Sequence, residues 1–463
     1  MTNYTRHPSS FKDPSGFVFE SEGKIYRQVN QYYAVQYRQL MDSGLYNLLV
    51  SRHQLIAHEE VAENITNAAE WYTTLLPEPV PTISYPYEWC FEQLQDAALL
   101  TLTVLKTALQ HGMILKDATP YNIQFYKGRP VFIDTLSFDT YDPKQPWIAY
   151  RQFCQCFLFP LYLEHYLKTD IQRILSTYID GIPVDIIAKL LPLKSRLSLG
   201  VWLHVYLQHS TSTSTSASAR TNKPNGAFSK KKLLDVIGHL NTIITNFPAN
   251  KTYKTTWSNY YEDTILSKEY LQEKETIIRE FCRQSKARNV LDLGANDGHF
   301  SKLFASHQMQ VIATDSDNRC ISRLYQEVKK NNMELILPLI LDIANPSPAI
   351  GFNNQERAAF HDRIKPDLVA ALALVHHLVI GKNISLPVLA SYFNSIAPEL
   401  IIEFVPKADE KVQQMLQSRP DTFPDYTITV FEALFFQHFE VISKKNVPGT
   451  HRVLYHLKRK NQP

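Results

Sequence analysis

The fold of the second half of this chain is decided by the stretch Val290-Leu-Asp-Leu-Gly294-Ala-Asn-Asp-Gly298-His-Phe300. Its apolar start predicts a buried strand, and the two glycines four residues apart predict a tight turn that leads into a helix. Glycine suits such a turn because a Cβ atom would block the close approach of a ligand to the backbone. A single glycine-rich turn is a weak signal, so the elements around it matter as much.

Apolar strands alternate with amphipathic helices on the C-terminal side of this stretch. Strands are predicted at 289–293, 310–314, 334–341, 366–371 and 400–404, and helices at 233–246, 268–284, 298–306, 318–330 and 384–396. This alternation predicts a parallel sheet that is covered on both faces. Two further strands, 439–443 and 452–456, are joined by a short connection and predict an antiparallel hairpin that closes the sheet.

Two acidic residues follow strands next to the glycine turn. Asp315 ends the second strand, where a carboxylate can accept hydrogen bonds from both hydroxyls of a ribose, and Asp342 ends the third, where it can contact an adenine amino group. An NAD-type domain or an unliganded α/β core is the alternative interpretation, but the G-x-G-x-x-G fingerprint of NAD sites is absent from the turn.

With this set, residues 260–458 resemble the class I S-adenosylmethionine-dependent methyltransferases. The resemblance implies an α/β fold with a Rossmann-like seven-stranded sheet whose last strand is antiparallel, and S-adenosylmethionine as cofactor. Asn296 stands where the family often has a middle glycine. The implied cofactor contacts are Asp292, Gly294, Asn296 and Gly298 for the amino-acid end, Asp315 for the ribose and Asp342 for the adenine. No metal is implied in this domain.

Three residues are candidates for the chemistry of methyl transfer. His376 and His377 follow the fourth strand and Glu403 ends the fifth, at the rim where methyl acceptors approach in this family. A histidine there can act as a general base or orient a nucleophile. Helix capping or ordinary packing explains the same residues equally well. Trp257, Tyr260 and Tyr261 are candidates for an aromatic lid over the cofactor, with core packing as the alternative.

A second constellation lies in the first half of the chain. Asp117 is followed five residues later by Asn122 and, after a short hairpin, by Asp134. Phosphotransfer needs one carboxylate that orients a hydroxyl nucleophile, and an amide and a second carboxylate that hold Mg²⁺. About 25 residues here resemble the catalytic loop of protein kinases and aminoglycoside-type phosphotransferases. The resemblance implies Asp117 as the base, Asn122 and Asp134 as metal ligands, and ATP with Mg²⁺ as cofactors.

Several features depart from that kinase-like pattern. Thr135 and Leu136 follow Asp134 where a kinase has Phe-Gly, and no glycine-rich loop or Val-Ala-Ile-Lys lysine is found near 17–29. Lys24 or Arg27 is a candidate substitute for that lysine. A degenerate kinase-like domain, kept as a scaffold or a substrate-binding module, is the alternative to an active phosphotransferase.

The first half has an α+β pattern and ends at a Ser/Thr-rich segment. Strands are predicted at 17–20, 25–29, 123–126 and 130–133, and helices at 34–49, 94–110 and 147–167. Residues 209–232 predict an exposed linker, because such a composition cannot bury enough apolar area to offset its ordering entropy. The predicted domains are therefore 1–208, kinase-like, and 233–463, with a helical cap before the methyltransferase sheet.

Composition excludes some classes of protein. The 463 residues carry a net charge of +3, which is not typical of a dedicated nucleic-acid binder. Five scattered cysteines and no apolar run of about 18 residues predict a reduced, cytoplasmic protein without a membrane span. The stretches 11–17, 58–60, 86–89 and 147–153 are similar to bacterial two-part proteins labelled as methyltransferases.

Three functions are consistent with these patterns. The first is a methyltransferase of unknown acceptor whose N-terminal domain binds substrate or regulates. The second is a bifunctional or ATP-gated protein, and the third is a non-catalytic interaction protein.

Overall fold

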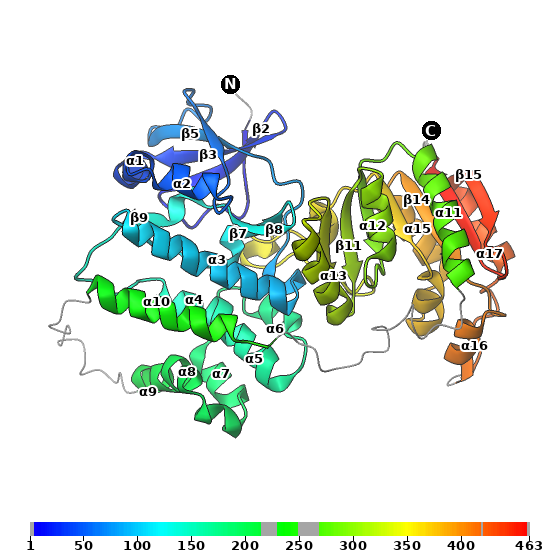
Figure 1. The fold of residues 1–463 in the computed structure, drawn as a ribbon. Helices are drawn as coiled ribbons and strands as arrows, with labels where there is room; N and C mark the ends of the chain where they lie inside the picture. Colours follow the sequence, from blue (N-terminus) through cyan, green and yellow to red (C-terminus); the bar gives the residue numbers. More distant parts are fainter. Residues whose placement is uncertain (1–3, 214–228, 249–267, 418–419, 461–463) are drawn as a thin grey trace. The chain divides into compact units, whose positions relative to one another are not determined.

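The computed structural model describes residues 4–213, 229–248, 268–417 and 420–460, and these fall into two compact units (Figure 1). Unit 1 contains Met1–Lys251 and Ala349–Ala358, and unit 2 contains Thr252–Pro348 and Ala359–Pro463. Ten residues from the middle of unit 2 in sequence thus pack with unit 1. The predicted lid residues Trp257, Tyr260 and Tyr261 lie outside the described residues. Within the described residues, no helix is both long and apolar enough to cross a membrane.

Unit 2 is built on a seven-stranded sheet of order β12-β11-β10-β13-β14-β16-β15. The first five strands in this order are parallel, and β16 pairs antiparallel with both β14 and β15. The predicted parallel sheet and its antiparallel closing hairpin are therefore confirmed. The strands are β10 (Asn289–Leu293), β11 (Gln310–Asp315), β12 (Ile336–Ile340), β13 (Leu368–Ala371), β14 (Glu399–Phe404), β15 (Phe439–Asn446) and β16 (Val453–Arg459).

Helices cover both faces of this sheet (Figure 1). On one face, α11 (Lys268–Gln284), α12 (His299–Ser306) and α13 (Asn318–Asn331) share one apolar core with alternate residues of the strands. On the other, α15 (Leu386–Ile396) and α17 (Ile428–His438) pack together, and the Phe431 ring of α17 lies 5.0 Å from that of Phe404 and 5.3 Å from that of Tyr455. The short helices α14 (Phe360–Arg363) and α16 (Glu410–Gln417) complete the unit.

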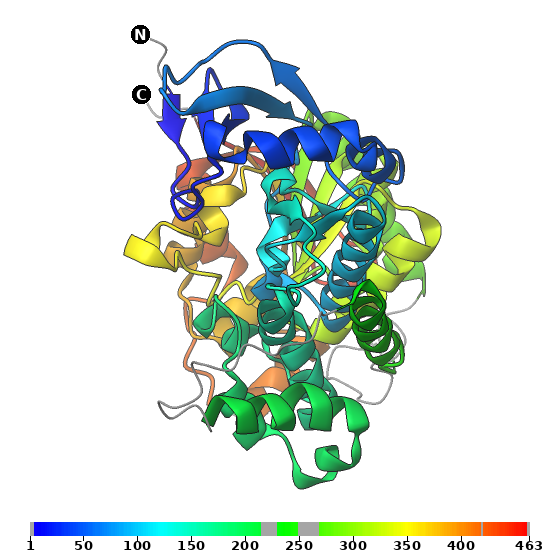
Figure 2. The same ribbon diagram turned by 90° about the vertical axis from the view of Figure 1, so that its left-hand side faces the viewer.

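Unit 1 begins with an antiparallel sheet of order β1-β2-β3-β5-β4. Its strands are β1 (Tyr4–Arg6), β2 (Gly16–Ser21), β3 (Lys24–Asn30), β4 (His58–Val61) and β5 (Trp71–Pro77). Between β3 and β4, two helices α1 (Ala34–Asp42) and α2 (Leu45–Ser51) stand beside the sheet (Figure 2). The sequence predicted one helix over 34–49, but Gly44 adopts φ +75° and breaks it.

The rest of unit 1 is mostly helical. The 20-residue α3 (Phe91–Gln110) is followed by two small sheets, in which β6 (Met113–Leu115) pairs with β9 (Phe138–Thr140) and β7 (Ile123–Tyr126) with β8 (Arg129–Phe132). The predicted hairpin after Asn122 is thus confirmed. The remaining helices are α4 (Tyr150–Phe153), α5 (Phe159–Leu167), α6 (Gln172–Thr177), α7 (Val184–Leu190), α8 (Leu199–Val201), α9 (Leu207–Thr213) and α10 (Lys230–Thr245), with π-helical turns at Cys154–Leu158 and Trp202–Tyr206.

The division between the units differs from the predicted one. Helices α9 and α10 extend into both ends of the predicted linker 209–232, and α10 packs against α3 of unit 1. The Gln95 side chain of α3 donates a hydrogen bond to the Ile244 carbonyl of α10 at 2.7 Å. The apolar side of α10, which the sequence assigned to a cap on the second domain, therefore completes the first one.

Gly16, at the start of β2, provides a test of close backbone packing in unit 1. A Cβ atom on this residue would lie 2.0 Å from the carbonyl oxygen of Gln28 in the paired strand β3. We expect Gly16→Ala to destabilise unit 1 by about 3 kcal/mol or more, because a paired strand must move to make room. The measurement is the urea midpoint of the unit 1 unfolding transition.

The matched control for this substitution is Gly23→Ala. Gly23 has a φ of +73° but open space where a Cβ atom would stand, so the change costs only about 1 kcal/mol of backbone strain. Equal midpoints for the two variants would contradict the packing argument.

Candidate functional site

The glycine turn that follows β10 is held against the end of β11. The amides of Gly294 and Ala295 both donate to the carbonyl of Thr314, at 2.8 and 2.9 Å. Gly294 adopts φ +74° and is exposed at the carboxyl edge of the sheet, and a Cβ atom there would lie 3.4 Å from Leu374. Gly298, with φ +77°, is the N-cap of α12. At Gly294 the turn therefore presents bare backbone where the parallel strands end, whereas a Cβ atom on the buried Gly298 would lie 2.4 Å from the Leu324 side chain.

Asp315 lies directly beside this turn. Its carboxylate accepts hydrogen bonds from the amide of Asn296 at 2.9 Å and from the amide of Asp317 at 2.8 Å. Burial raises the pKa of Asp315, and these two hydrogen bonds oppose that rise. Each carboxylate oxygen can accept a further hydrogen bond, so the group is fixed in position and still able to bind a hydroxyl pair.

The other two predicted carboxylates occupy different environments. Asp292 is buried in β10 beneath the turn, accepts a hydrogen bond from the Ser301 hydroxyl at 2.6 Å, and has its pKa raised by burial to about 6. Asp342 is half-buried after β12, where it accepts from the amide of Ala344 at 3.0 Å and lies 3.8 Å from the ammonium of Lys382. Asp292 thus supports the turn from below, whereas Asp342 stands at its rim.

The two predicted histidines follow β13 at the same edge of the sheet. The His376 ring is fully buried 4.0 Å from the His377 ring, and neither of its nitrogens has a hydrogen-bond partner among the described residues. Burial lowers the pKa of His376 well below its usual range and that of His377 to about 4. Both shifts favour the neutral form of the ring, in which one nitrogen accepts a hydrogen bond and the other donates one.

Glu403 does not stand free at the rim. Its carboxylate is completely buried on the face of the sheet that α11 covers, 2.5 Å from the ammonium of Lys274 and 3.1 Å from the hydroxyl of Tyr270. The guanidinium of Arg452 lies 3.7 Å away and also binds Asp409 at 2.7 and 3.0 Å. Burial alone would raise the pKa of Glu403, but the charges of Lys274 and Arg452 outweigh burial and lower it.

Sequence reasoning missed the cations of this network, although a signal was present. The buried side of α11 is formed by residues spaced three or four positions apart, which are Tyr270, Lys274, Ile278 and Phe281. A lysine within the apolar stripe of an amphipathic helix calls for a buried counter-charge. Glu403 is that counter-charge, so the environment of its carboxylate is that of a structural ion pair.

The structure brings the three predicted kinase-like residues of unit 1 together. The Asn122 amide donates to Asp117 at 3.1 Å and to the Ser137 hydroxyl at 3.0 Å, and that hydroxyl donates to Asp134 at 2.5 Å. Arg27, one of the two candidate substitutes for the missing lysine, reaches Asp134 at 2.6 Å. Burial and the nearby Asp134 raise the pKa of Asp117. The bridging role of Ser137 was not predicted.

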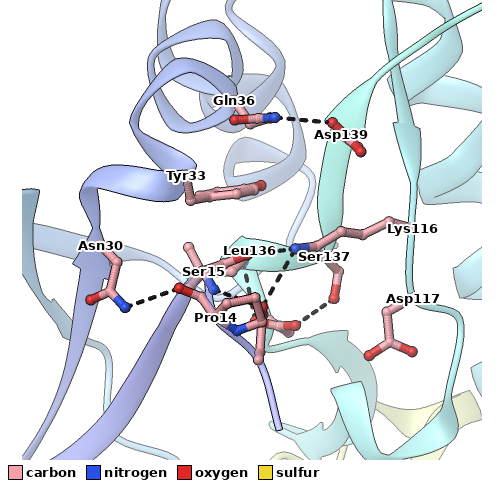
Figure 3. Close-up of polar contacts among 12 residues, drawn as sticks. Pro14, Ser15, Asn30, Tyr33, Gln36, Lys116, Asp117, Leu136, Ser137 and Asp139 are labelled. Atoms are coloured by element: carbon pink, nitrogen blue, oxygen red, sulfur yellow. Dashed lines mark hydrogen bonds and ion pairs between the residues drawn. The ribbon is translucent and has the colours of Figure 1, made fainter. Parts of the chain in front are cut away.

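The loop between β1 and β2 reaches the same place. Figure 3 shows the Lys116 side chain pointing at Ser15, whose hydroxyl it contacts at 2.7 Å, and Asp13 lies 3.7 Å from the same ammonium. The side-chain amide of Asn30 donates a hydrogen bond to the Pro14 carbonyl at 3.0 Å. The loop thus closes over the residue that precedes Asp117 in the chain.

Segment 349–358 packs on the loops that carry this polar cluster. Lys12, from the β1–β2 loop, binds the buried Glu356 at 2.8 Å. The guanidinium of Arg357 lies 4.1 Å from the ring centre of Tyr121, the neighbour of Asn122. This segment, which lies between β12 and β13 in sequence, therefore contacts both the β1–β2 loop and the loop that carries Asn122.

The strand order of unit 2, its antiparallel last strand and the glycine turn beside Asp315 define a class I methyltransferase, of the S-adenosylmethionine-dependent class. No protein-family model matches the sequence. The chain belongs to the family of the nodulation protein NoeA of Rhizobium meliloti (strain 1021), with 31% identity over 467 residues, which is 98% of this chain and 96% of that protein.

Solved structures resemble parts of the chain. One is the N-methyltransferase NodS from Bradyrhizobium japonicum WM9, with 14% identity over 42% of this chain and 99% of that chain and a TM-score of 0.32. Another is the magnesium protoporphyrin IX methyltransferase ChlM from Synechocystis PCC 6803 with bound SAH, with 15% identity, 44% and 93% coverage and a TM-score of 0.32. A co-crystal structure of WbdD and the kinase inhibitor LY294002 matches with 18% identity, 47% coverage of each chain and a TM-score of 0.30.

Substitution of Glu403 separates a structural role from a catalytic one. Glu403→Gln leaves Lys274 and Arg452 without their shared counter-charge inside the protein, so we expect unit 2 to lose about 3–5 kcal/mol of stability. Adding Lys274→Met removes the stranded ammonium, and much of the loss should be recovered. The free energy of the unit 2 unfolding transition is the measurement.

Glu440→Gln is the control, because Glu440 is an exposed glutamate on β15 of the same unit. It should change the free energy of unfolding by no more than about 0.5 kcal/mol. If Glu403→Gln unfolded at the same denaturant concentration as this control, the buried ion pair would have no structural role.

Proposed function

We propose that the protein transfers a methyl group from S-adenosylmethionine to an acceptor, with the cofactor bound along the glycine turn of unit 2. The observation that carries the proposal is the Asp315 carboxylate, which two backbone amides hold beside the exposed Gly294. In this arrangement Asp315 binds the ribose hydroxyls, and Asn296, Gly294 and Gly298 line the amino-acid end.

The residues present suit a cofactor with these chemical groups. The exposed backbone at Gly294 gives room for close approach, and Asp315 offers acceptors for a pair of hydroxyls. Asp342 accepts a hydrogen bond from the adenine amino group. To do so, its carboxylate must give up its 3.8 Å contact with the ammonium of Lys382. Asp292 acts through the turn that it supports.

His376 and His377 serve the acceptor side of the site. Their neutral rings follow β13, and Leu374 of the same segment lies against the position where a Cβ of Gly294 would stand. The two ring nitrogens of His376 have no hydrogen-bond partner among the described residues, so one can accept from and the other donate to groups that orient an attacking nucleophile, whereas its lowered pKa makes it a weak general base. When bound, the cofactor supplies an electrophilic methyl group, so the chain's own contribution is to position the acceptor and exclude water.

Binding of S-adenosylhomocysteine to the full chain tests the cofactor site. By calorimetry we expect binding to the wild-type protein, and a dissociation constant about 10–100-fold higher for Asp315→Ala, because hydrogen bonds to a charged group contribute about 1.5–3 kcal/mol. Asp425→Asn removes an exposed carboxylate from the same unit and should bind like the wild type. A folded wild-type protein that takes up no S-adenosylhomocysteine would overturn the proposal.

Unit 1 has a second candidate function, the binding of ATP with Mg²⁺ for phosphotransfer or for gating. The observation that favours it is the Ser137 hydroxyl, which contacts both Asn122 and Asp134. Asn122 and Asp134 would hold the metal, which neutralises phosphate charge when bound. Asp117 fits a base, since its Oδ1 is buried with no hydrogen bond of normal geometry to the described residues.

The contacts of segment 349–358 support a regulatory link in this second function. Lys12 and Tyr121 stand on the two loops that a ligand of unit 1 would touch, and both hold this segment. The segment continues in sequence from Asp342, so in this second proposal it links the loops of unit 1 to the adenine side of the methyltransferase site. Unit 1 would then act as a gate on methyl transfer.

A nucleotide titration tests the role of unit 1. We expect calorimetry on the full chain to show binding of ADP that requires Mg²⁺, and Asp134→Asn to weaken it at least about tenfold, since a metal ligand is lost. Asp142→Asn, an exposed carboxylate of the same unit, is the control. A protein that binds S-adenosylhomocysteine but gives no heat with ADP and Mg²⁺ would leave unit 1 as a substrate-binding module or scaffold.

A further inference from the structure

Large apolar side chains are exposed on the C-terminal helices of unit 1. Leu197 is 91% exposed, Leu193 74% and Leu199 66%, and Leu190 and Trp202 are also exposed. These residues lie within thirteen positions on α7, α8 and the turns between them and α9, and these elements contact one another (Figure 1). Scattered single leucines on a surface are ordinary, but five large apolar side chains exposed so close together in the chain make this segment a candidate interaction site.

The exposure is not caused by a lack of packing in this region. The same elements also bury five apolar side chains, which are those of Val184, Ile187, Leu191, Val201 and Val205. The segment therefore buries one set of apolar side chains, which stabilises it, and exposes a second set to solvent. A segment built this way retains its fold while it presents leucines outwards.

Basic residues alternate with the exposed leucines. Lys189, Lys194 and Arg196 are all exposed. Between Asp185 and Asp235 the sequence contains no acidic residue, although the net charge of the whole chain is only +3. The positive charge is thus a local property of this part of the chain.

We infer that this leucine–basic surface (Lys189, Leu190, Leu193, Lys194, Arg196, Leu197, Leu199 and Trp202) binds the surface of a negatively charged lipid bilayer. Leucine and tryptophan side chains enter the boundary between headgroups and acyl chains, while lysine and arginine keep their charges among anionic headgroups. A protein partner is less favoured, because the cores of protein interfaces are depleted in lysine. The inference is independent of the methyltransferase proposal.

Co-sedimentation of the full chain with lipid vesicles tests this surface. We expect binding to phosphatidylcholine vesicles that contain phosphatidylserine, much weaker binding to pure phosphatidylcholine, and loss of binding as salt is raised. Lys194→Glu/Arg196→Glu should weaken binding at least about tenfold, because each basic residue near the membrane contributes roughly a factor of five. Leu193→Ser/Leu197→Ser should weaken it as well, and at all salt concentrations.

Ile148→Ser/Val35→Ser is the matched control. These two apolar residues of unit 1 are 77% and 64% exposed but lie outside the surface, so their loss should leave vesicle binding unchanged. Failure to sediment with anionic vesicles at low salt would overturn the inference. So would a dimer in solution that Leu193→Ser/Leu197→Ser dissociates, since a second copy of the chain would then be the occupant.

Discussion

The candidate methyltransferase site depends on the hydrogen bonds between the glycine turn and the end of β11. Two consecutive amides share the Thr314 carbonyl, the Thr314 hydroxyl donates to the carbonyl of Asp292, and the next amide, that of Asn296, reaches Asp315. The turn is therefore fixed in shape by its neighbouring strand before any ligand binds. Such preorganisation lowers the entropy cost of binding, and the shape of the turn requires left-handed backbone at three residues, Gly294, Asn296 and Gly298.

A buried ion-pair network lies under the same edge of the sheet and constrains α11. Taking Lys274, Arg452 and Glu403 out of water costs several kcal/mol for each charge, which their attraction offsets only if the geometry is good. Distances of 2.5 Å for Lys274 and 3.7 Å for Arg452 to Glu403 place both cations within range of the one carboxylate. Because Tyr270 and Lys274 both reach Glu403 from α11, the network ties the position of this helix to strand β14.

The sequence was sufficient to predict the parts of the fold that follow local patterns. Strand β10, the turn and Asp315 lie where periodicity and glycine spacing placed them, and so does the antiparallel β16. The apolar stripe of α11 indicates that Lys274 needs a buried counter-charge, but not that Glu403 supplies it, because the two residues are 129 positions apart and only packing brings them together. The same limit applies to segment 349–358, whose contact with Lys12 spans 344 positions. Local patterns carry no information about which unit such a segment joins.

The placement of segment 349–358 has a physical consequence for any coupling in the chain. A ligand shifts an equilibrium only by the difference between its affinities for the two states. For unit 1 to gate unit 2, its ligand must therefore favour one arrangement of the loops that bear Lys12 and Tyr121. Their contacts with the segment are an ion pair between the exposed Lys12 and the buried Glu356, and a cation–π contact between Arg357 and Tyr121. Contacts of these kinds contribute about 1 kcal/mol each. If the proposed gate operates through these two contacts, they limit its coupling to about 2 kcal/mol, which ligand binding could reverse.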